Sequence, residues 1–301
     1  MADTTLSKNQ LDVINDDHPC KLVVAGPGTG KTTIILEIIK RLITKGVLPE
    51  QILVITFTKS NTSDFIKKVS DFIDKEKRPR INNLHSFSLQ ELVRNSPEQV
   101  GISLPIRIAD DFEEELIQDD IKNILKIGDK KIKELFNRLS AGWENLNADK
   151  TGWEESFSSE VPRFISVWKD HKKIYGYTLR GELVYRYKKF LDQNRDYRME
   201  PKPLFLIVDE YQDMNRCDQK VINLINKYTG CHLICAGDDD QSIYSFRLAY
   251  PEGIRLFQQD YPNSKEYELE ECYRCDKNIL SLSLNVIEQD TNRIPKFLKS
   301  V

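Results

Sequence analysis

One glycine-rich stretch constrains this chain more than any other sequence feature. Its residues are Ala25, Gly26, Pro27, Gly28, Thr29, Gly30, Lys31 and Thr32. An apolar run at residues 22–24 precedes it, and a longer apolar segment at residues 34–43 follows it. This order predicts a buried strand, a tight turn and a helix. Small residues in such a turn let several backbone N–H groups point at a phosphate chain, and the helix N-terminus adds positive potential.

The stretch fits a P-loop in which Ala25 takes the place of the first glycine. We expect Lys31 to lie against the β- and γ-phosphates of a nucleotide, and the Thr32 hydroxyl to ligate Mg²⁺. The dinucleotide-binding fingerprint does not fit, because it needs a glycine where Lys31 stands. A chance glycine-rich turn beside a lysine is the alternative, and the flanking strand and helix patterns argue against it.

Composition and charge narrow the class of protein. The 301 residues are enough for two domains, or for one domain with a large insertion. A net charge of −3 excludes a globally basic surface, so a nucleic-acid partner would need a local basic groove. Apolar runs fall well short of the ~20 residues of a membrane span, and residues 1–5 lack the features of a signal peptide. The six scattered cysteines favour a reducing compartment, so we expect a cytoplasmic protein without a membrane partner.

Strand and helix patterns alternate over much of the chain. Further strands are predicted at residues 52–57, 204–208, 231–235 and 266–269, and helical patterns lie between them. Such alternation predicts an α/β fold with a mainly parallel sheet. From about residue 95 to 190 the alternation stops, and apolar residues recur only at helical spacing. We interpret this part as a helical insertion. Asn61 or Thr62 is expected to cap the helix that follows the second strand.

Acidic residues follow two of the predicted strands. Asp209 and Glu210 come directly after residues 204–208, and Gln241 follows three aspartates after residues 231–235. Open α/β sheets bind ligands at the carboxyl ends of their strands. One acid there can complete a Mg²⁺ shell while its neighbour deprotonates the attacking water. Calcium is an alternative for the three aspartates, but the spacing of an EF-hand is absent.

The chain has one CxxC pair, Cys272 and Cys275. A zinc site normally adds a second such pair or nearby histidines. Neither is present in the sequence, so we interpret both residues as ordinary thiols.

These stretches together resemble the ATPase core of the UvrD/Rep/PcrA-type superfamily 1 DNA helicases. The resemblance runs from residue 6 to about residue 280 and follows the family's motif order. The matching stretches are residues 6–10 (Q-motif), 25–32 (motif I), 55–58 (Ia), 85–87 (Ib), 209–213 (II), 237–244 (III) and 273–274 (IV). The combination of the P-loop with DEYQD and GDDDQSIY is highly specific.

The resemblance implies roles in ATP binding and hydrolysis. Gln10 and Tyr273 should hold the adenine, Tyr273 by stacking on it. The P-loop backbone up to Thr33 should surround the phosphates, while Lys31, Thr32 and Asp209 hold phosphates and Mg²⁺. Glu210 should be the catalytic base, and Gln241 and Arg274 should sense the γ-phosphate.

The resemblance also implies contacts with single-stranded DNA or a tailed duplex. Phe57, Tyr244 and Phe246 stand where the family stacks bases, and stacking tolerates any sequence. Thr58, His85 and Arg247 would contact the DNA backbone or bases. The family usually has tryptophan at the position of Phe246, so stacking there should be weaker.

The resemblance implies a RecA-like P-loop NTPase domain with an inserted all-helical domain. We expect its segments at residues 1–95 and 191–265, the insertion at 96–190, and the start of a second RecA-like domain at 266–301. The leading hypothesis is the ATP-binding half of a 3′→5′ translocase. Because the second domain is expected to be incomplete, slow ATPase activity and no unwinding are predicted unless another protein supplies it. An ATP-binding regulatory subunit without unwinding activity is the alternative; a P-loop kinase would leave motifs II to IV unexplained.

Overall fold

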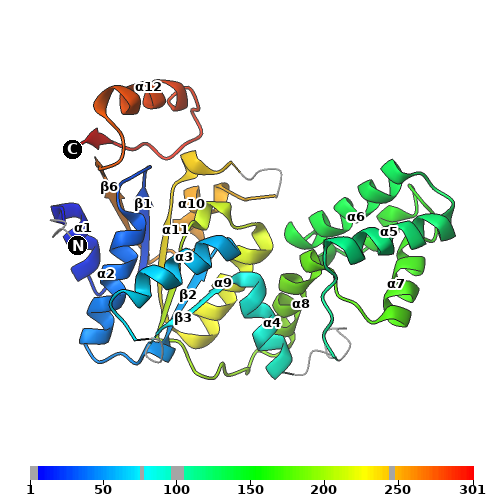
Figure 1. Cartoon of the computed structure of the whole chain (residues 1–301). Coiled ribbons are helices and arrows are strands. Elements are labelled where there is room, and N and C mark those ends of the chain that lie inside the picture. Colours follow the sequence, from blue (N-terminus) through cyan, green and yellow to red (C-terminus); the bar gives the residue numbers. More distant parts are fainter. Residues whose placement is uncertain (1–5, 75–77, 96–104, 244–247) are drawn as a thin grey trace. The chain divides into compact units, whose positions relative to one another are not determined.

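The computed structural model describes residues 6–74, 78–95, 105–243 and 248–301 (Figure 1). The chain forms two compact units. The first comprises Met1–Asn83, Tyr197–Met214 and Ile222–Val301, and the second comprises Leu84–Asp196 and Asn215–Val221. In the described residues, no helix is both long and apolar enough to cross a membrane.

A six-stranded sheet forms the centre of the first unit, in the order β3-β2-β4-β5-β1-β6. Its strands are β1 (Cys20–Ala25), β2 (Ile52–Thr56), β3 (Arg80–Asn83), β4 (Phe205–Val208), β5 (His232–Gly237) and β6 (Lys265–Leu269). Every neighbouring pair is parallel, so all carboxyl ends meet at one edge. The predicted α/β fold with its parallel sheet is therefore confirmed.

Helices cover the sheet of the first unit. They are α1 (Lys8–Asn15), α2 (Lys31–Thr44), α3 (Lys59–Ser70), the later part of α9 (Arg216–Thr229), α10 (Glu252–Arg255) and α11 (Phe257–Asp260). A further helix of this unit, α12 (Lys277–Ile287), lies apart from the sheet (Figure 1). One apolar core joins α1, α2 and α3 to one face of the sheet through residues such as Ile38, Phe65 and Ile207, all nearly inaccessible to solvent. Burial of these side chains is the main force that holds the glycine-rich turn at the sheet edge.

Capping residues fix where two of these helices begin. Ser7 caps α1 in a reciprocal capping box with Gln10. Thr58 caps α3, and its hydroxyl accepts a hydrogen bond from the Asn61 N–H at 3.0 Å. The predicted caps at Asn61 or Thr62 were wrong by about one turn, because the helix already begins at Lys59 and the extended residue directly before it is Thr58.

The second unit is helical. It contains α4 (Leu84–Arg94), α5 (Asp111–Leu125), α6 (Asp129–Glu144), α7 (Phe164–Tyr175), α8 (Arg180–Gln193) and the first residues of α9. Aromatic rings form much of its core, and the Phe136 and Phe157 rings both pack on Phe164 with centroids 5.7 and 5.6 Å away. The unit begins before and ends after the predicted insertion at residues 96–190.

The last residues of the chain pack on the first unit. The short strands β7 (Glu271–Cys272) and β8 (Lys299–Ser300) pair in parallel. The structure differs here from the predicted division at residue 265, because β6 pairs along its length with β1 as part of the first sheet. Residues 266–301 belong to the same compact unit as the glycine-rich turn. Strand patterns predict where a strand lies but not which sheet it joins.

Candidate nucleotide-binding site

The glycine-rich turn connects β1 to α2, as predicted. Its backbone is left-handed at Gly28 and Gly30, with φ values of 71° and 90°. Side chains are excluded at both positions for a second reason. A Cβ atom at Gly28 would lie 2.4 Å from Arg274 Cβ, and one at Gly30 would lie 2.7 Å from Gln10 Nε2. Because glycine alone meets both demands, the turn can keep its N–H groups directed inward.

Gln10 ties the turn to α1. Its Nε2 donates to the Thr29 carbonyl at 3.0 Å, and its Oε1 accepts from the Ser7 N–H at 3.0 Å. The backbone N–H of Tyr273 donates to the Gly28 carbonyl at 3.0 Å, and its ring is 43% exposed. The two residues expected to hold adenine therefore both contact the turn, one from each terminal part of the chain.

Sheet register brings the acidic motifs to the turn. Val208 at the end of β4 pairs with Cys235 of β5, and Gly237 of β5 pairs with Val24 of β1. Residues that directly follow these strands therefore share one edge. An ion pair joins the turn to the acids after β4, with Lys31 Nζ 2.8 Å from Glu210 Oε2. This ion pair is mostly shielded from solvent, with side chains 10% and 26% exposed.

Glu210 is held by more than this ion pair. Its backbone is left-handed at φ 54°, which is uncommon for a residue with a side chain. Its Oε2 also accepts from Gln212 Nε2 at 2.9 Å. The Gln212 side chain in turn accepts at its Oε1 from the Asp238 N–H at 3.0 Å. One buried amide thus connects the acid after β4 with the acidic turn after β5.

Buried carboxyl groups at this edge carry raised pKa values. Burial raises the pKa of Asp209 to about 6, and the charge of Glu210 adds to the effect. Burial also raises the pKa of Asp213 to about 7, again with a contribution from Glu210. Asp213 Oδ1 is buried and has no hydrogen-bond partner among the residues that the structure describes. Such a surplus of negative charge is typical of edges that bind a cation.

The residues fit a magnesium ion. The Asp209 carboxylate and the Thr32 hydroxyl are oxygen ligands of the kind that Mg²⁺ prefers. The Glu210 N–H donates to Asp209 Oδ1 at 3.1 Å, which fixes the carboxylate. A divalent cation here would also favour the charged form of Asp209, which burial and the charge of Glu210 disfavour.

The three aspartates after β5 surround a lysine. Lys296 Nζ lies 2.6 Å from Asp238, 2.5 Å from Asp239 and 2.9 Å from Asp240. Among the described residues, these aspartates are the one group of three or more His, Cys, Asp or Glu side chains that lie close enough together to share an ion. Because the Lys296 ammonium group already neutralises part of their charge, the structure does not favour calcium at these aspartates.

The cysteines of the CxxC pair are free thiols, and the Cys272 thiol donates to the Pro27 carbonyl at 3.1 Å.

A pocket of about 360 Å³ collects most of the predicted nucleotide-site residues. It is lined by Leu6, Gln10, residues 28–33, Lys68, Glu210, Gln241, Tyr273 and Arg274. Gln241 is held by its Nε2, which donates to Asp238 Oδ2 at 2.6 Å. Lys68 is a lining residue that the sequence did not predict, since an exposed basic residue near the end of a helix has no distinguishing pattern.

The predicted DNA contacts are more scattered. Phe57 and Thr58 follow β2 at the same sheet edge as the acidic motifs. His85 lies at the start of α4 in the helical unit, and its side chain is exposed. Tyr244, Phe246 and Arg247 lie outside the described residues.

The fold and this site define a class of α/β proteins with a P-loop-type turn at the carboxyl edge of a parallel sheet. Residues 6–262 match the family model described as "UvrD/REP helicase N-terminal domain". This match covers most of the chain, so the chain belongs to the UvrD/REP helicase family, and the resemblance seen in the sequence is confirmed.

Curated relatives carry helicase names. The chain is similar to "ATP-dependent DNA helicase Rep" of Buchnera aphidicola subsp. Acyrthosiphon pisum (strain APS), with 28% identity over 97% of this chain and 46% of the relative. It is 26% identical to "ATP-dependent DNA helicase PcrA" of Staphylococcus epidermidis over 97% of this chain and 41% of the relative. It is 24% identical to PcrA of Leuconostoc citreum, again over 97% of this chain. The chain spans less than half the length of these relatives.

Proposed function

We propose that this chain binds ATP–Mg²⁺ and is the ATP-binding half of an ATP-dependent DNA helicase. One observation carries the proposal: Lys31, Glu210, Gln241 and Arg274 line the same pocket, although they are far apart in the sequence. Each has the chemistry that phosphoryl transfer to water requires. The helicase names of the relatives support the DNA-dependent part of the proposal.

Each residue of the site has its own role in ATP hydrolysis. N–H groups of the turn and Lys31 bind the phosphates, and Glu210 orients the attacking water and takes its proton. Gln241 and Arg274 stabilise the charge that develops on the γ-phosphate. Thr32 and Asp209 would hold Mg²⁺, which neutralises phosphate charge when it is bound.

The ion pair between Lys31 and Glu210 sets an order of events. When a nucleotide is bound, the Lys31 ammonium group would contact the phosphates and the Glu210 carboxylate would contact the attacking water. ATP binding must therefore exchange the carboxylate partner of Lys31 for a phosphate. This exchange releases Glu210 as a base only when the site is occupied, which limits wasted proton transfer.

The first test measures ATP hydrolysis by the purified chain with and without single-stranded DNA. We expect ATP turnover that disappears when EDTA removes Mg²⁺ and returns when Mg²⁺ is restored. DNA stimulation would favour the helicase proposal over an ATP-binding regulatory subunit. ATP binding with no turnover, even when a protein that supplies a second motor domain is added, would favour the regulatory subunit.

The second test concerns DNA. Phe57→Ala should weaken single-stranded DNA binding by about 1–3 kcal/mol if the ring stacks on a base. Fluorescence anisotropy at low salt measures the effect, and wild-type affinity should fall steeply as salt rises. Phe112→Ala is the matched control, because Phe112 is a 67% exposed aromatic residue of α5 with no proposed DNA role. Equal losses in both variants, or none in Phe57→Ala, would remove Phe57 from the DNA site.

A further inference from the structure

The C-terminal segment, residues 291–301, is attached to the candidate site at several points. The Ile294 N–H donates to Asp239 Oδ2 at 2.9 Å, and the Lys299 N–H donates to the Glu270 carbonyl at 2.8 Å. The segment also reaches the glycine-rich turn, because a Cβ atom at Gly26 would lie 2.6 Å from Leu298 Cδ1. The match to the family model ends at residue 262, so this segment lies beyond the matched region.

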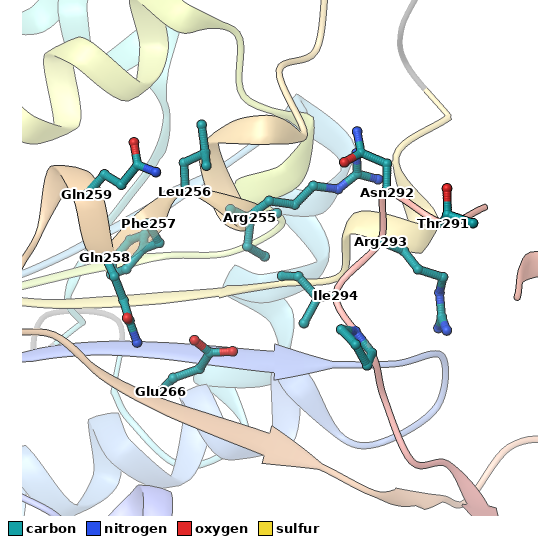
Figure 2. Close-up of a pocket in the computed structure, with 12 residues that line it drawn as sticks. Arg255, Leu256, Phe257, Gln258, Gln259, Glu266, Thr291, Asn292, Arg293 and Ile294 are labelled. Atoms are coloured by element: carbon teal, nitrogen blue, oxygen red, sulfur yellow. The ribbon is translucent and has the colours of Figure 1, made fainter.

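Figure 2 shows the surroundings of this segment. Arg293 and Ile294 come from the segment, while Arg255 comes from α10, and they line a pocket of about 460 Å³. Both arginines point their charge at the aspartates rather than at an empty space. Arg293 Nε lies 2.9 Å from Asp240, and Arg255 Nε lies 2.9 Å from Asp239. Each arginine that lines the pocket therefore already has a carboxylate partner.

Lys296 is the most enclosed cation of the segment. Its side chain is 1% exposed, and Asp238 and Asp239 beside it are fully buried. Burial disfavours its charged form, but the three carboxylates outweigh burial and raise the pKa of the ammonium group. Burying so many charges has a large desolvation cost, and the interaction among them is only partly a source of stability. We therefore explain the buried cluster of Lys296 and the three aspartates by the side-chain positions that it fixes rather than by added stability.

A series of hydrogen bonds connects Lys296 to Gln241 and to Glu210, which both line the nucleotide pocket. Lys296 holds Asp238 Oδ1 at 2.6 Å, and the other oxygen of Asp238 accepts from Gln241 Nε2 at 2.6 Å. The Asp238 N–H donates to Gln212, whose Nε2 donates to Glu210. Asp238 thus stands between the lysine and two groups that face the γ-phosphate in the proposed function.

We propose that Lys296 is a positioning residue that aligns Gln241 for the γ-phosphate by holding the Asp238 carboxylate. The proposal rests on the proposed ATP site. Without Lys296, the Asp238 carboxylate would keep the hydrogen bonds from the Asp240 N–H and from Gln241 Nε2 but would lose its cationic partner. The carboxylate could then turn toward another donor, and the Gln241 amide would lose its fixed direction. The C-terminal segment is then part of the machinery that distinguishes ATP from ADP.

The experiment compares Lys296→Gln with the unaltered chain. It measures dissociation constants for ADP and for the non-hydrolysable analogue adenylyl imidodiphosphate, both with Mg²⁺, together with kcat and KM for ATP. We expect the preference for the triphosphate analogue over ADP, and kcat, to fall about tenfold, the scale of coupling through such networks. ADP affinity should stay within about twofold. Lys296→Arg, which keeps the charge, should recover part of the loss.

Lys299→Gln is the matched control, because Lys299 belongs to the same segment but is 62% exposed and pairs with Glu270 at 3.3 Å. It should leave both nucleotide affinities and kcat unchanged. A second arm combines Lys296→Gln with Gln241→Ala. If Lys296 acts through Gln241, the double variant should be no worse than Gln241→Ala alone. Multiplicative losses, or equal weakening of ADP and analogue binding, would mean a structural role and would overturn the proposal.

One measurement needs no variant, in case Lys296→Gln does not fold. Amide hydrogen exchange at residues 294–299 of the unaltered chain should slow more with the triphosphate analogue than with ADP. Equal exchange in both nucleotide states would overturn the proposal. If the unaltered chain binds neither nucleotide, the proposed function fails; if it binds both and Lys296→Gln behaves like Lys299→Gln, the positioning role alone fails.

Discussion

Glu210→Gln is expected to hydrolyse ATP at least a hundredfold more slowly than the unaltered chain while binding ATP at least as tightly. The amide cannot take a proton from water, and a positioned general base contributes about 10²–10⁴ in rate. Binding should not suffer, because the substitution also removes the carboxylate that pairs with Lys31 at 2.8 Å. In this variant, Lys31 can bind the phosphates without first breaking an ion pair.

Steady-state ATPase assays and titration with a fluorescent ATP analogue measure the two effects separately. Glu37→Gln is the control, since Glu37 is a half-buried carboxylate on α2 that also pairs with a lysine, Lys40, at 2.6 Å. It should change neither quantity. Normal turnover by Glu210→Gln would show that another group takes the proton. Weaker ATP binding by that variant would contradict the competition between Glu210 and phosphate.

Lys31→Ala is expected to weaken ATP binding about ten- to a hundredfold and to abolish measurable hydrolysis. A hydrogen bond to a charged group contributes about 1.5–3 kcal/mol, and this lysine would make such bonds to the phosphates. The loss has a second cause. With Lys31 removed, the negative charge of Glu210 faces the triphosphate without its partner. The effect on ATP should therefore exceed the effect on ADP, which carries less charge.

Isothermal titration of ATP and ADP into Lys31→Ala checks this prediction. Lys40→Ala is the matched control, because Lys40 lies on the same helix, pairs with Glu37 and contacts the Phe72 ring at 4.6 Å from its centroid. The control should keep wild-type affinity and turnover. If Lys31→Ala bound ATP as tightly as this control, the P-loop assignment would be lost.

The local parts of this structure follow from the sequence. Apolar runs such as residues 22–24 and 204–208 predict buried strands, and the glycine-rich stretch predicts a tight turn. The structure has these strands and the turn, whose backbone is left-handed at Gly28 and Gly30. These features depend on side chains close together in the chain, so their patterns are visible without a structure. Motif order alone also identified the family, which the match over residues 6–262 confirmed.

Sequence reasoning reached its limit where charges meet across long separations. It assigned Lys31 and Glu210 to the same site but did not pair them, although their atoms lie 2.8 Å apart across 179 residues. It placed β6 at the start of a second domain, whereas hydrogen bonding joins this strand to β1. It also gave no role to Lys296. A lysine's sequence neighbours do not reveal which carboxylates surround it.

The physical reason is the range of the forces involved. Hydrophobic periodicity and turn chemistry act within a few residues, so the sequence by itself determined the strands, the turn and the family motifs. The choice of partner for a strand or a buried charge depends on the sheet register and on the packing of remote segments. The tertiary structure alone decided that the C-terminal segment places a buried lysine against the acidic turn that carries Gln241.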